Sequence, residues 1–109
     1  MTSPPPNLER YVLRLFVTGT TVRSQRAITN MRKICEERLQ GRYDLEVIDV
    51  YQNPAATREY QIVATPTLIK ILPQPLRRII GDLSSREKVI SGLNLHVRPD
   101  LPGGDLDRG

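Results

Sequence analysis

The sequence predicts an α/β fold in which a parallel strand–helix–strand unit is followed by an antiparallel hairpin and a closing helix. Three observations support it: two apolar runs flank a helical pattern, a short proline-containing link joins two later strands, and a capping pattern precedes the last helical segment. The chain has 109 residues, of which 39% are hydrophobic and 26% charged, enough for one core. We therefore expect a single domain over residues 10–97, between a flexible Pro-rich leader (1–9) and a disordered tail (98–109).

The first half has the pattern of a crossover unit. Residues 11–17 are an almost continuous apolar run, which suits a strand buried on both faces. The Thr20-Thr21 pair can cap the helix that follows, and Gly41 is its stop signal. Residues 45–50 form the next strand, and a connection of this length through a helix implies parallel pairing. The apolar face of the helix consists of Ala27, Ile28, Met31, Ile34, Cys35 and Leu39.

The second half begins with a short helix and continues with a hairpin. Asn53-Pro54 is an N-cap and first-turn pair, from which a helix should run to about Gln61. Strands are expected over 67–72 and 76–80. Because only three residues separate these strands, they should pair in the antiparallel sense.

A closing helix follows a capping box. Ser84 and Glu87 have the spacing at which each side chain satisfies a free backbone donor near the other residue. The helix then carries Val89, Ile90 and Leu93. The complete order, β-α-β-α-β-β-α with a parallel first half and an antiparallel second half, resembles the thioredoxin-like arrangement.

Thioredoxin-like redox enzymes place a Cys-x-x-Cys pair at the start of the first helix, where the helix dipole lowers the thiol pKa. Residues 18–24 of this chain contain no cysteine. The one cysteine, Cys35, belongs to the apolar face of the helix several turns later, so a buried structural role is favoured over a reactive one. No redox activity is expected. The hydroxyls of Thr18, Thr20 and Thr21 could bind an anion at the start of the helix, but a capping role is favoured.

Other classes of function find little support. His96 is the only histidine and has no second ligand nearby, so neither a metal nor a catalytic role is expected. No run approaches the roughly 20 apolar residues of a membrane helix, and the start lacks signal-peptide features, so we expect a cytoplasmic protein. Aromatic residues are too few for a nucleic-acid stacking surface. The chain has thirteen arginines and three lysines. This excess of arginine suits contact with an acidic protein partner, and a solvated arginine-rich surface is an equally good interpretation.

Several segments resemble the KaiB family of cyanobacterial circadian clock proteins. Residues 64–68 read ATPTL, residues 72–75 read LPQP and residues 77–89 read RRIIGDLSSREKV. Matches in 11–15, 47–50 and 53–54 fall in the same register, so the resemblance covers about residues 10–95.

This resemblance implies a non-enzymatic regulator and its partners. A KaiB-type protein binds the ATPase ring of the hexameric KaiC kinase, opposes the stimulation of KaiC phosphorylation by KaiA, and recruits or displaces output histidine kinases. The short helix and the residues after it mainly engage KaiC in that family. Here they correspond to Pro54, Tyr60, Gln61 and Ile62. No cofactor is implied.

The resemblance also implies two folds for one chain. KaiB-like proteins rest as a tetramer whose second half departs from the thioredoxin pattern, and a monomer with the full pattern binds KaiC. Gly92 and Asn94 weaken the last helix, since Gly costs roughly 1 kcal/mol relative to Ala there. The X-Pro bonds at Pro66, Pro73 and Pro75 bracket the region and isomerise slowly when uncatalysed. Close helix packing at Gly92 and simple turns at the prolines are the alternative interpretation.

The chain departs from clock members along the second strand. KaiA is bound along that edge in the family, with Tyr11 beside it, and here the edge presents Asp44 and Glu46 where typical members are apolar or basic. Such a charge reversal can suppress a partner, so whether this chain binds KaiA stays open. Two other functions stay open: a redox-inactive thioredoxin-like binding or chaperone-like domain in a stress pathway, and an enzyme, either a weak nucleotide hydrolase or a thiol enzyme using Cys35.

Overall fold

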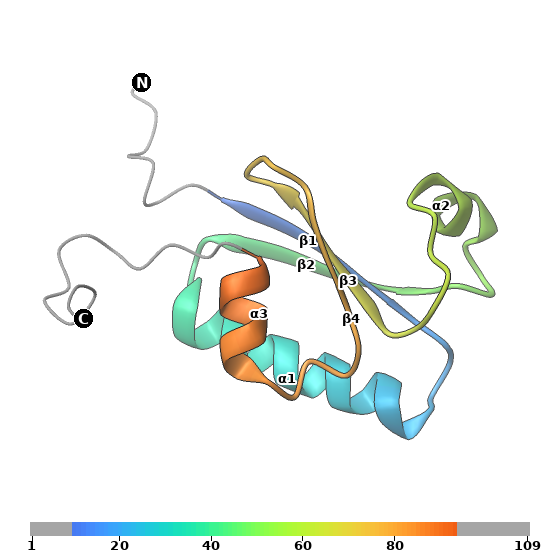
Figure 1. Cartoon of the computed structure of the whole chain (residues 1–109), viewed down its shortest axis with the longest axis horizontal. Helices are drawn as coiled ribbons and strands as arrows, with labels where there is room; N and C mark the ends of the chain where they lie inside the picture. The colour runs from blue at the N-terminus through green and yellow to red at the C-terminus, as the bar shows by residue number, and fades with distance from the viewer. Residues whose placement is uncertain (1–9, 94–109) are drawn as a thin grey trace, which may run out of the picture.

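The computed structural model of this chain describes residues 10–93 (Figure 1). Its elements follow the expected order β-α-β-α-β-β-α. The three helices are α1 (Val22–Arg38), α2 (Pro54–Glu59) and α3 (Arg86–Gly92). The four strands are β1 (Tyr11–Val17), β2 (Tyr43–Asp49), β3 (Thr67–Leu72) and β4 (Arg77–Ile80).

The strands form one sheet in the order β2-β1-β3-β4. β1 and β2 pair in parallel, whereas β3 is antiparallel to both β1 and β4, as the connection lengths predict. The second strand begins at Tyr43, two residues earlier than expected, because Tyr43 pairs with Tyr11 at the start of β1. The sheet therefore ends in two edge strands, β2 and β4.

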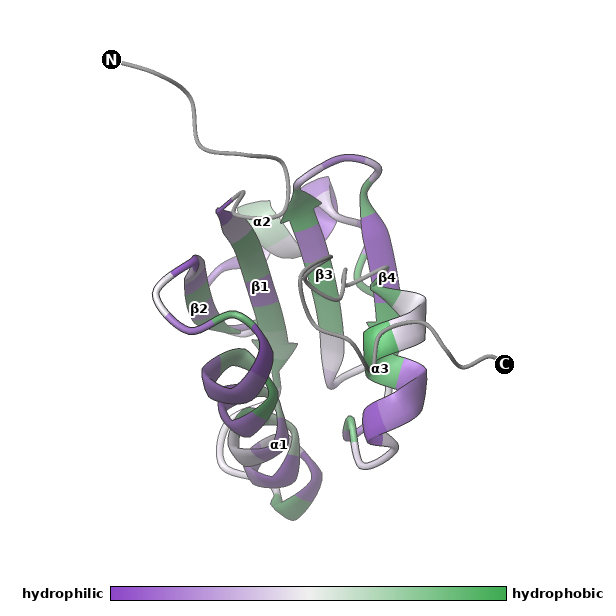
Figure 2. Cartoon of the chain, turned by 90° about the vertical axis from the view of Figure 1, so that its left-hand side faces the viewer, coloured by the Kyte–Doolittle hydropathy of each residue, from purple (hydrophilic) through white to green (hydrophobic). Residues whose placement is uncertain are grey.

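Helices cover the two faces of the sheet unequally. The larger core lies between the sheet and α1 and α3, where Leu13 and Leu15 of β1 meet Met31 of α1 and Val89 of α3, all fully or almost fully buried. A smaller cluster of Phe16, Ile48 and Ile69 lies on the other face, with α2 against it at one end (Figures 1 and 2). We call these the large-core face and the small-core face. Part of the small-core face has no helix over it.

Helix termini follow the predicted chemistry with two corrections. Thr21 caps α1, its hydroxyl accepting a hydrogen bond from the backbone N–H of Ser24 at 3.2 Å. The N-cap of α3 is Ser85, not Ser84, and the Ser85 hydroxyl accepts a hydrogen bond from the backbone N–H of Lys88 at 3.4 Å. α2 ends at Glu59, two residues earlier than expected.

Three X-Pro peptide bonds are cis, those before Pro66, Pro73 and Pro75. The leader and the tail expected at 1–9 and 98–109 lie outside the described residues, as do Asn94 and His96. Within residues 10–93, none of the helices has the length and apolar content needed to cross a bilayer.

Candidate protein-binding site

The helix α2 stands on the small-core face with little of its own surface buried. None of its six residues is buried, and its contact with the sheet comes from its one half-buried alanine and from the residues that follow the helix. The ring of Tyr60 lies against the ring of Phe16 in β1, with centroids 5.8 Å apart and planes inclined by 54°. This tilted pair anchors the C-terminal end of α2 and leaves most of the helix facing solvent.

The chain after α2 turns back sharply and is held at several points. Gln61 has a left-handed backbone with φ of 54°, and the N–H of Ile62 donates to the carbonyl of Thr57 at 3.0 Å. From β4, Arg78 donates to the carbonyl of Gln61 through Nη1 at 3.4 Å. The segment between α2 and β3 is thus fixed to both the helix and the sheet.

The structure divides the four residues implied to bind KaiC into two kinds. Pro54 and Gln61 are exposed, so they are available to a partner. Tyr60 and Ile62 are half-buried and pack against the small core, so they chiefly hold the segment in place. Sequence reasoning missed Val63, which is 87% exposed although apolar. The sequence signal for this exposure is the position of Val63 between the short helix and the next strand, where neither the helical nor the strand periodicity applies.

The residues implied for the second-strand edge do not share one surface. Asp44 and Glu46 are exposed on the small-core face of β2. The Oε1 atom of Glu46 forms an ion pair with Nε of Arg14 at 3.0 Å. Tyr11 lies on the large-core face and is only 2% exposed. A partner on the small-core side of β2 would therefore meet the two carboxylates and not Tyr11.

Where a redox enzyme of this fold would keep its thiols, this chain has hydroxyls. Oγ1 of Thr18 and Oγ1 of Thr65 are hydrogen-bonded at 2.5 Å, and the Thr18 N–H donates to the hydroxyl of Ser24. Cys35 is fully buried in the large core, where desolvation, with a smaller contribution from the nearby Glu36 carboxylate, raises its pKa to about 12. The site cannot carry out thiol–disulfide exchange, because that reaction needs an accessible thiolate.

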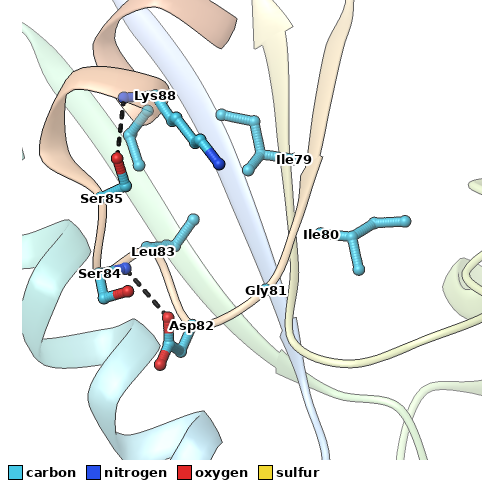
Figure 3. A pocket seen from close by; sticks show the side chains of 9 residues that line it. Ile79, Ile80, Gly81, Asp82, Leu83, Ser84, Ser85 and Lys88 are labelled. Carbon is cyan, nitrogen blue, oxygen red and sulfur yellow. Dashed lines mark hydrogen bonds between the residues drawn. The ribbon is translucent and has the colours of Figure 1, made fainter.

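One pocket, of about 170 Å³, opens between the end of β4 and the start of α3 (Figure 3). Two of its polar side chains already accept hydrogen bonds from the local backbone: Asp82 accepts from the Ser84 N–H at 3.1 Å and Ser85 accepts from the Lys88 N–H at 3.4 Å. Across residues 10–93, no three His, Cys, Asp or Glu side chains gather closely enough to hold a metal ion. The pocket therefore helps to define the start of α3 and has no assembled set of reactive groups.

Fold and site together define a thioredoxin-like protein without the thiol pair, whose exposed features suit contacts with other proteins. The family model described as "KaiB domain" matches residues 14–95, and the chain belongs to the KaiB family. It is 53% identical over 89 residues to the circadian clock protein KaiB3 of a Synechocystis strain, covering 82% of this chain and 87% of the relative. It is 56% identical over 85 residues to the circadian clock oscillator protein KaiB of Microcystis aeruginosa, covering 78% and 82%.

Solved structures support the same fold. The N-terminal domain of SasA from Synechococcus elongatus superposes with a TM-score of 0.65 at 26% identity, covering 90% of this chain and 96% of that domain. Oxidised mitochondrial thioredoxin 3 of Saccharomyces cerevisiae gives a TM-score of 0.64 at 16% identity, covering 79% and 78%, and shows the fold alone. The predicted thioredoxin-like α/β architecture is confirmed.

Proposed function

We propose that this chain is a non-enzymatic KaiB-type regulator that binds the ATPase ring of a KaiC-like hexameric kinase and modulates its phosphorylation state. Binding uses the solvent-facing surface of α2 together with the segment that follows it, centred on Pro54, Gln61 and Val63. The observation that carries this proposal is the exposure of that surface: α2 has no buried residue, and Val63 places an unburied apolar side chain beside it. Protein interfaces combine an apolar centre with a polar rim, and Val63 with its exposed polar neighbours can supply both.

A binding assay with matched variants tests the proposal. The wild-type chain is incubated with an immobilised KaiC-type hexamer and ATP until binding reaches a plateau. Val63→Asp should weaken binding by about tenfold or more, because a carboxylate would be desolvated at the contact. Val22→Asp is the control, since Val22 is also an exposed apolar residue, 68% exposed, at the start of α1 on the opposite side of the sheet. Absence of wild-type binding after long incubation, or an equal loss in both variants, would contradict the proposal.

The proposal includes a second arrangement of the second half of the chain, in a tetramer or dimer that exchanges with the monomer. The closing elements depend on few contacts: α3 has seven residues and β4 has four. Isolated helices shorter than about 12 residues are marginal in water, so α3 depends on its packing. The region runs from Pro66 through Pro73 and Pro75 to Gly92 and Asn94.

Size-exclusion chromatography and amide NMR spectra across a concentration series test the second arrangement. Gly92→Ala combined with Asn94→Arg should shift the balance between oligomer and monomer, and the spectra should contain two sets of peaks in slow exchange. Identical elution and one set of peaks in both proteins would contradict this part of the proposal.

The partner at the β2 edge is expected to differ from that of typical clock members. Asp44 and Glu46 give this edge exposed negative charge, which opposes a partner that meets apolar or basic residues there. We therefore expect weak or no binding to KaiA, and Asp44→Lys with Glu46→Lys to increase it. Measured affinities for KaiA that do not change between the two proteins would contradict this expectation. The N-terminal domain of SasA from Synechococcus elongatus resembles the chain in fold, so it can be added to the same assay as a competitor for the KaiC-type hexamer.

A further inference from the structure

The pocket of about 170 Å³ between β4 and α3 has a preformed wall. The loop that joins these two elements is held at two points: the Gly81 N–H donates to the Pro66 carbonyl at 2.9 Å, and Nδ2 of Asn30 in α1 donates to the Asp82 carbonyl at 2.9 Å. Within this loop, Leu83 has a left-handed backbone with φ of 63°, although it is not a glycine. Such a backbone persists only where the surrounding structure fixes it. The wall of the pocket therefore has its shape before anything binds.

The inner part of the pocket is apolar, and its volume sets the size of what fits. Leu83 and Val89 belong to the large core, and Ile79 of β4 packs against that core. A dry cavity of about 150 Å³ is enough to hold a molecule of benzene. Because this pocket opens to solvent, it has room for an apolar body of about six carbons with a polar group at the mouth.

One cationic side chain extends over the pocket. Lys88 of α3 reaches toward Ile79 of β4 (Figure 3). Among residues 10–93, no ion pair or hydrogen bond engages the ammonium group of Lys88. Its backbone N–H is already bonded to the Ser85 hydroxyl at 3.4 Å. The group available to an anion is therefore the ammonium and not the start of the helix.

The carboxylate in the pocket faces other partners. Asp82 accepts hydrogen bonds from the backbone and side chain of Ser84, and Arg23 and Arg26 of α1 attract it. Figure 3 shows this carboxylate at the end of the pocket away from Lys88. A molecule that brings its own carboxylate to the ammonium would thus form an ion pair that the chain does not form by itself.

We infer that this pocket binds a small monocarboxylate with an apolar body of about six carbons, the body among Ile79, Leu83 and Val89 and the carboxylate against the ammonium of Lys88. The site is separate from the surface of α2 that we propose meets a kinase, and binding to it is independent of that proposal. An exposed ion pair contributes little, so burial of the apolar body supplies most of the affinity. For a molecule of this size we expect a dissociation constant of about 1–10 mM.

Amide NMR titration of the full chain tests the inference, with benzoate as the probe and benzamide as its neutral control of the same shape. Benzoate should give saturable shifts that centre on residues 79–89. Benzamide should bind about threefold more weakly or worse, because it lacks the charge. Shifts that do not saturate by about 50 mM, or that centre on another surface, would overturn the inference. Equal affinities for the two compounds would overturn it as well.

Two lysine variants identify the cation. Lys88→Met keeps an unbranched apolar side chain and removes the charge, so the affinity for benzoate should fall by about threefold or more while that for benzamide stays the same. Lys33→Met is the matched control, because Lys33 is an exposed lysine of α1 that does not line the pocket. Amide spectra that superimpose away from the substitution confirm that each variant folds. No loss in Lys88→Met, or an equal loss in both variants, would contradict the assignment of the carboxylate to Lys88.

Hydrogen exchange supplies a measurement that does not depend on charge. A molecule that contacts both β4 and α3 binds only while these elements are packed together, so it should slow the exchange in α3 that requires their separation. With benzoate at ten times its dissociation constant, the expected slowing is about tenfold, whereas exchange in α2 should stay the same. Unchanged exchange in α3, or equal slowing in α2, would rule out binding between β4 and α3.

Discussion

Gly92 of α3 lies against Ile79 of β4 so closely that a Cβ atom on residue 92 would stand 3.0 Å from Cδ1 of Ile79 and 3.3 Å from its Cγ1. The glycine thus lets α3 approach the sheet edge, which agrees with the close-packing interpretation of this position. The same residue weakens the helix, since glycine loses more conformational freedom on folding than alanine does. Packing and helix propensity therefore act in opposite directions at one residue.

This opposition predicts non-additive effects of two substitutions. Gly92→Ala should change the free energy of unfolding by less than about 0.5 kcal/mol, because a helix gain of about 1 kcal/mol is offset by displacement of Ile79. Ile79→Val removes the Cδ1 atom that is in the way. The double variant should be more stable than the sum of the single effects by about 0.5–1 kcal/mol in urea titrations. Additive effects would show that Ile79 does not restrict residue 92.

The pair Tyr60 and Phe16 predicts how α2 is held. Tyr60→Leu removes the aromatic contact and should lower the free energy of unfolding by about 1 kcal/mol. Hydrogen exchange should accelerate first over residues 54–62, while exchange in β1 changes less. The control is Tyr51→Leu, since Tyr51 is 78% exposed and should tolerate the change. Equal effects of the two substitutions would rule out the anchoring role.

The buried thiol predicts a reactivity and a pH dependence. Burial raises the pKa of Cys35 to about 12 from its ordinary value of 9.0, so the folded chain should not react with iodoacetamide at pH 8. The unfolded chain in guanidinium should react fully. Because the folded pKa is the higher one, stability is retained below pH 9 and falls as pH rises from 9 toward 12. Rapid labelling of the folded protein at pH 8 would restore the thiol-enzyme alternative.

The loop before α3 predicts a local titration. Hydrogen bonds from the side chain and backbone of Ser84 lower the pKa of Asp82 below 3.8, and Arg23 and Arg26 lower it further. A lowered folded pKa favours the folded state above the unfolded value, and this contribution is lost as the pH falls through the folded pKa. Side-chain carboxyl NMR should show a depressed midpoint for Asp82 that rises in Ser84→Ala. A midpoint unchanged by that substitution would exclude the serine hydroxyl as a cause.

Local patterns predicted the secondary structure well because strand and helix periodicities depend on neighbouring residues. The strands over 11–17 and 67–72 agree with the structure residue for residue. The cap was misplaced because two adjacent serines have equal capping ability, and which of them caps depends on the residue at which the helix begins, Arg86. The exposure of Val63 depends on how the chain leaves α2, which local pattern does not encode.

The candidate surfaces were harder to predict because they combine strands that are distant in sequence. Alternation along a strand could have separated Tyr11 from Asp44, since their register places them on opposite faces. The pairing of Glu46 with Arg14 depends on which strands are neighbours in the order β2-β1-β3-β4, which short-range pattern does not fix.

The hydrogen bond between Thr18 and Thr65 has a consequence for how the chain responds to oxidants. Two hydroxyls cannot be oxidised to a covalent crosslink, and the single sulfur of the one cysteine is enclosed in the large core. Exposure to peroxide should therefore form no disulfide crosslink in this fold.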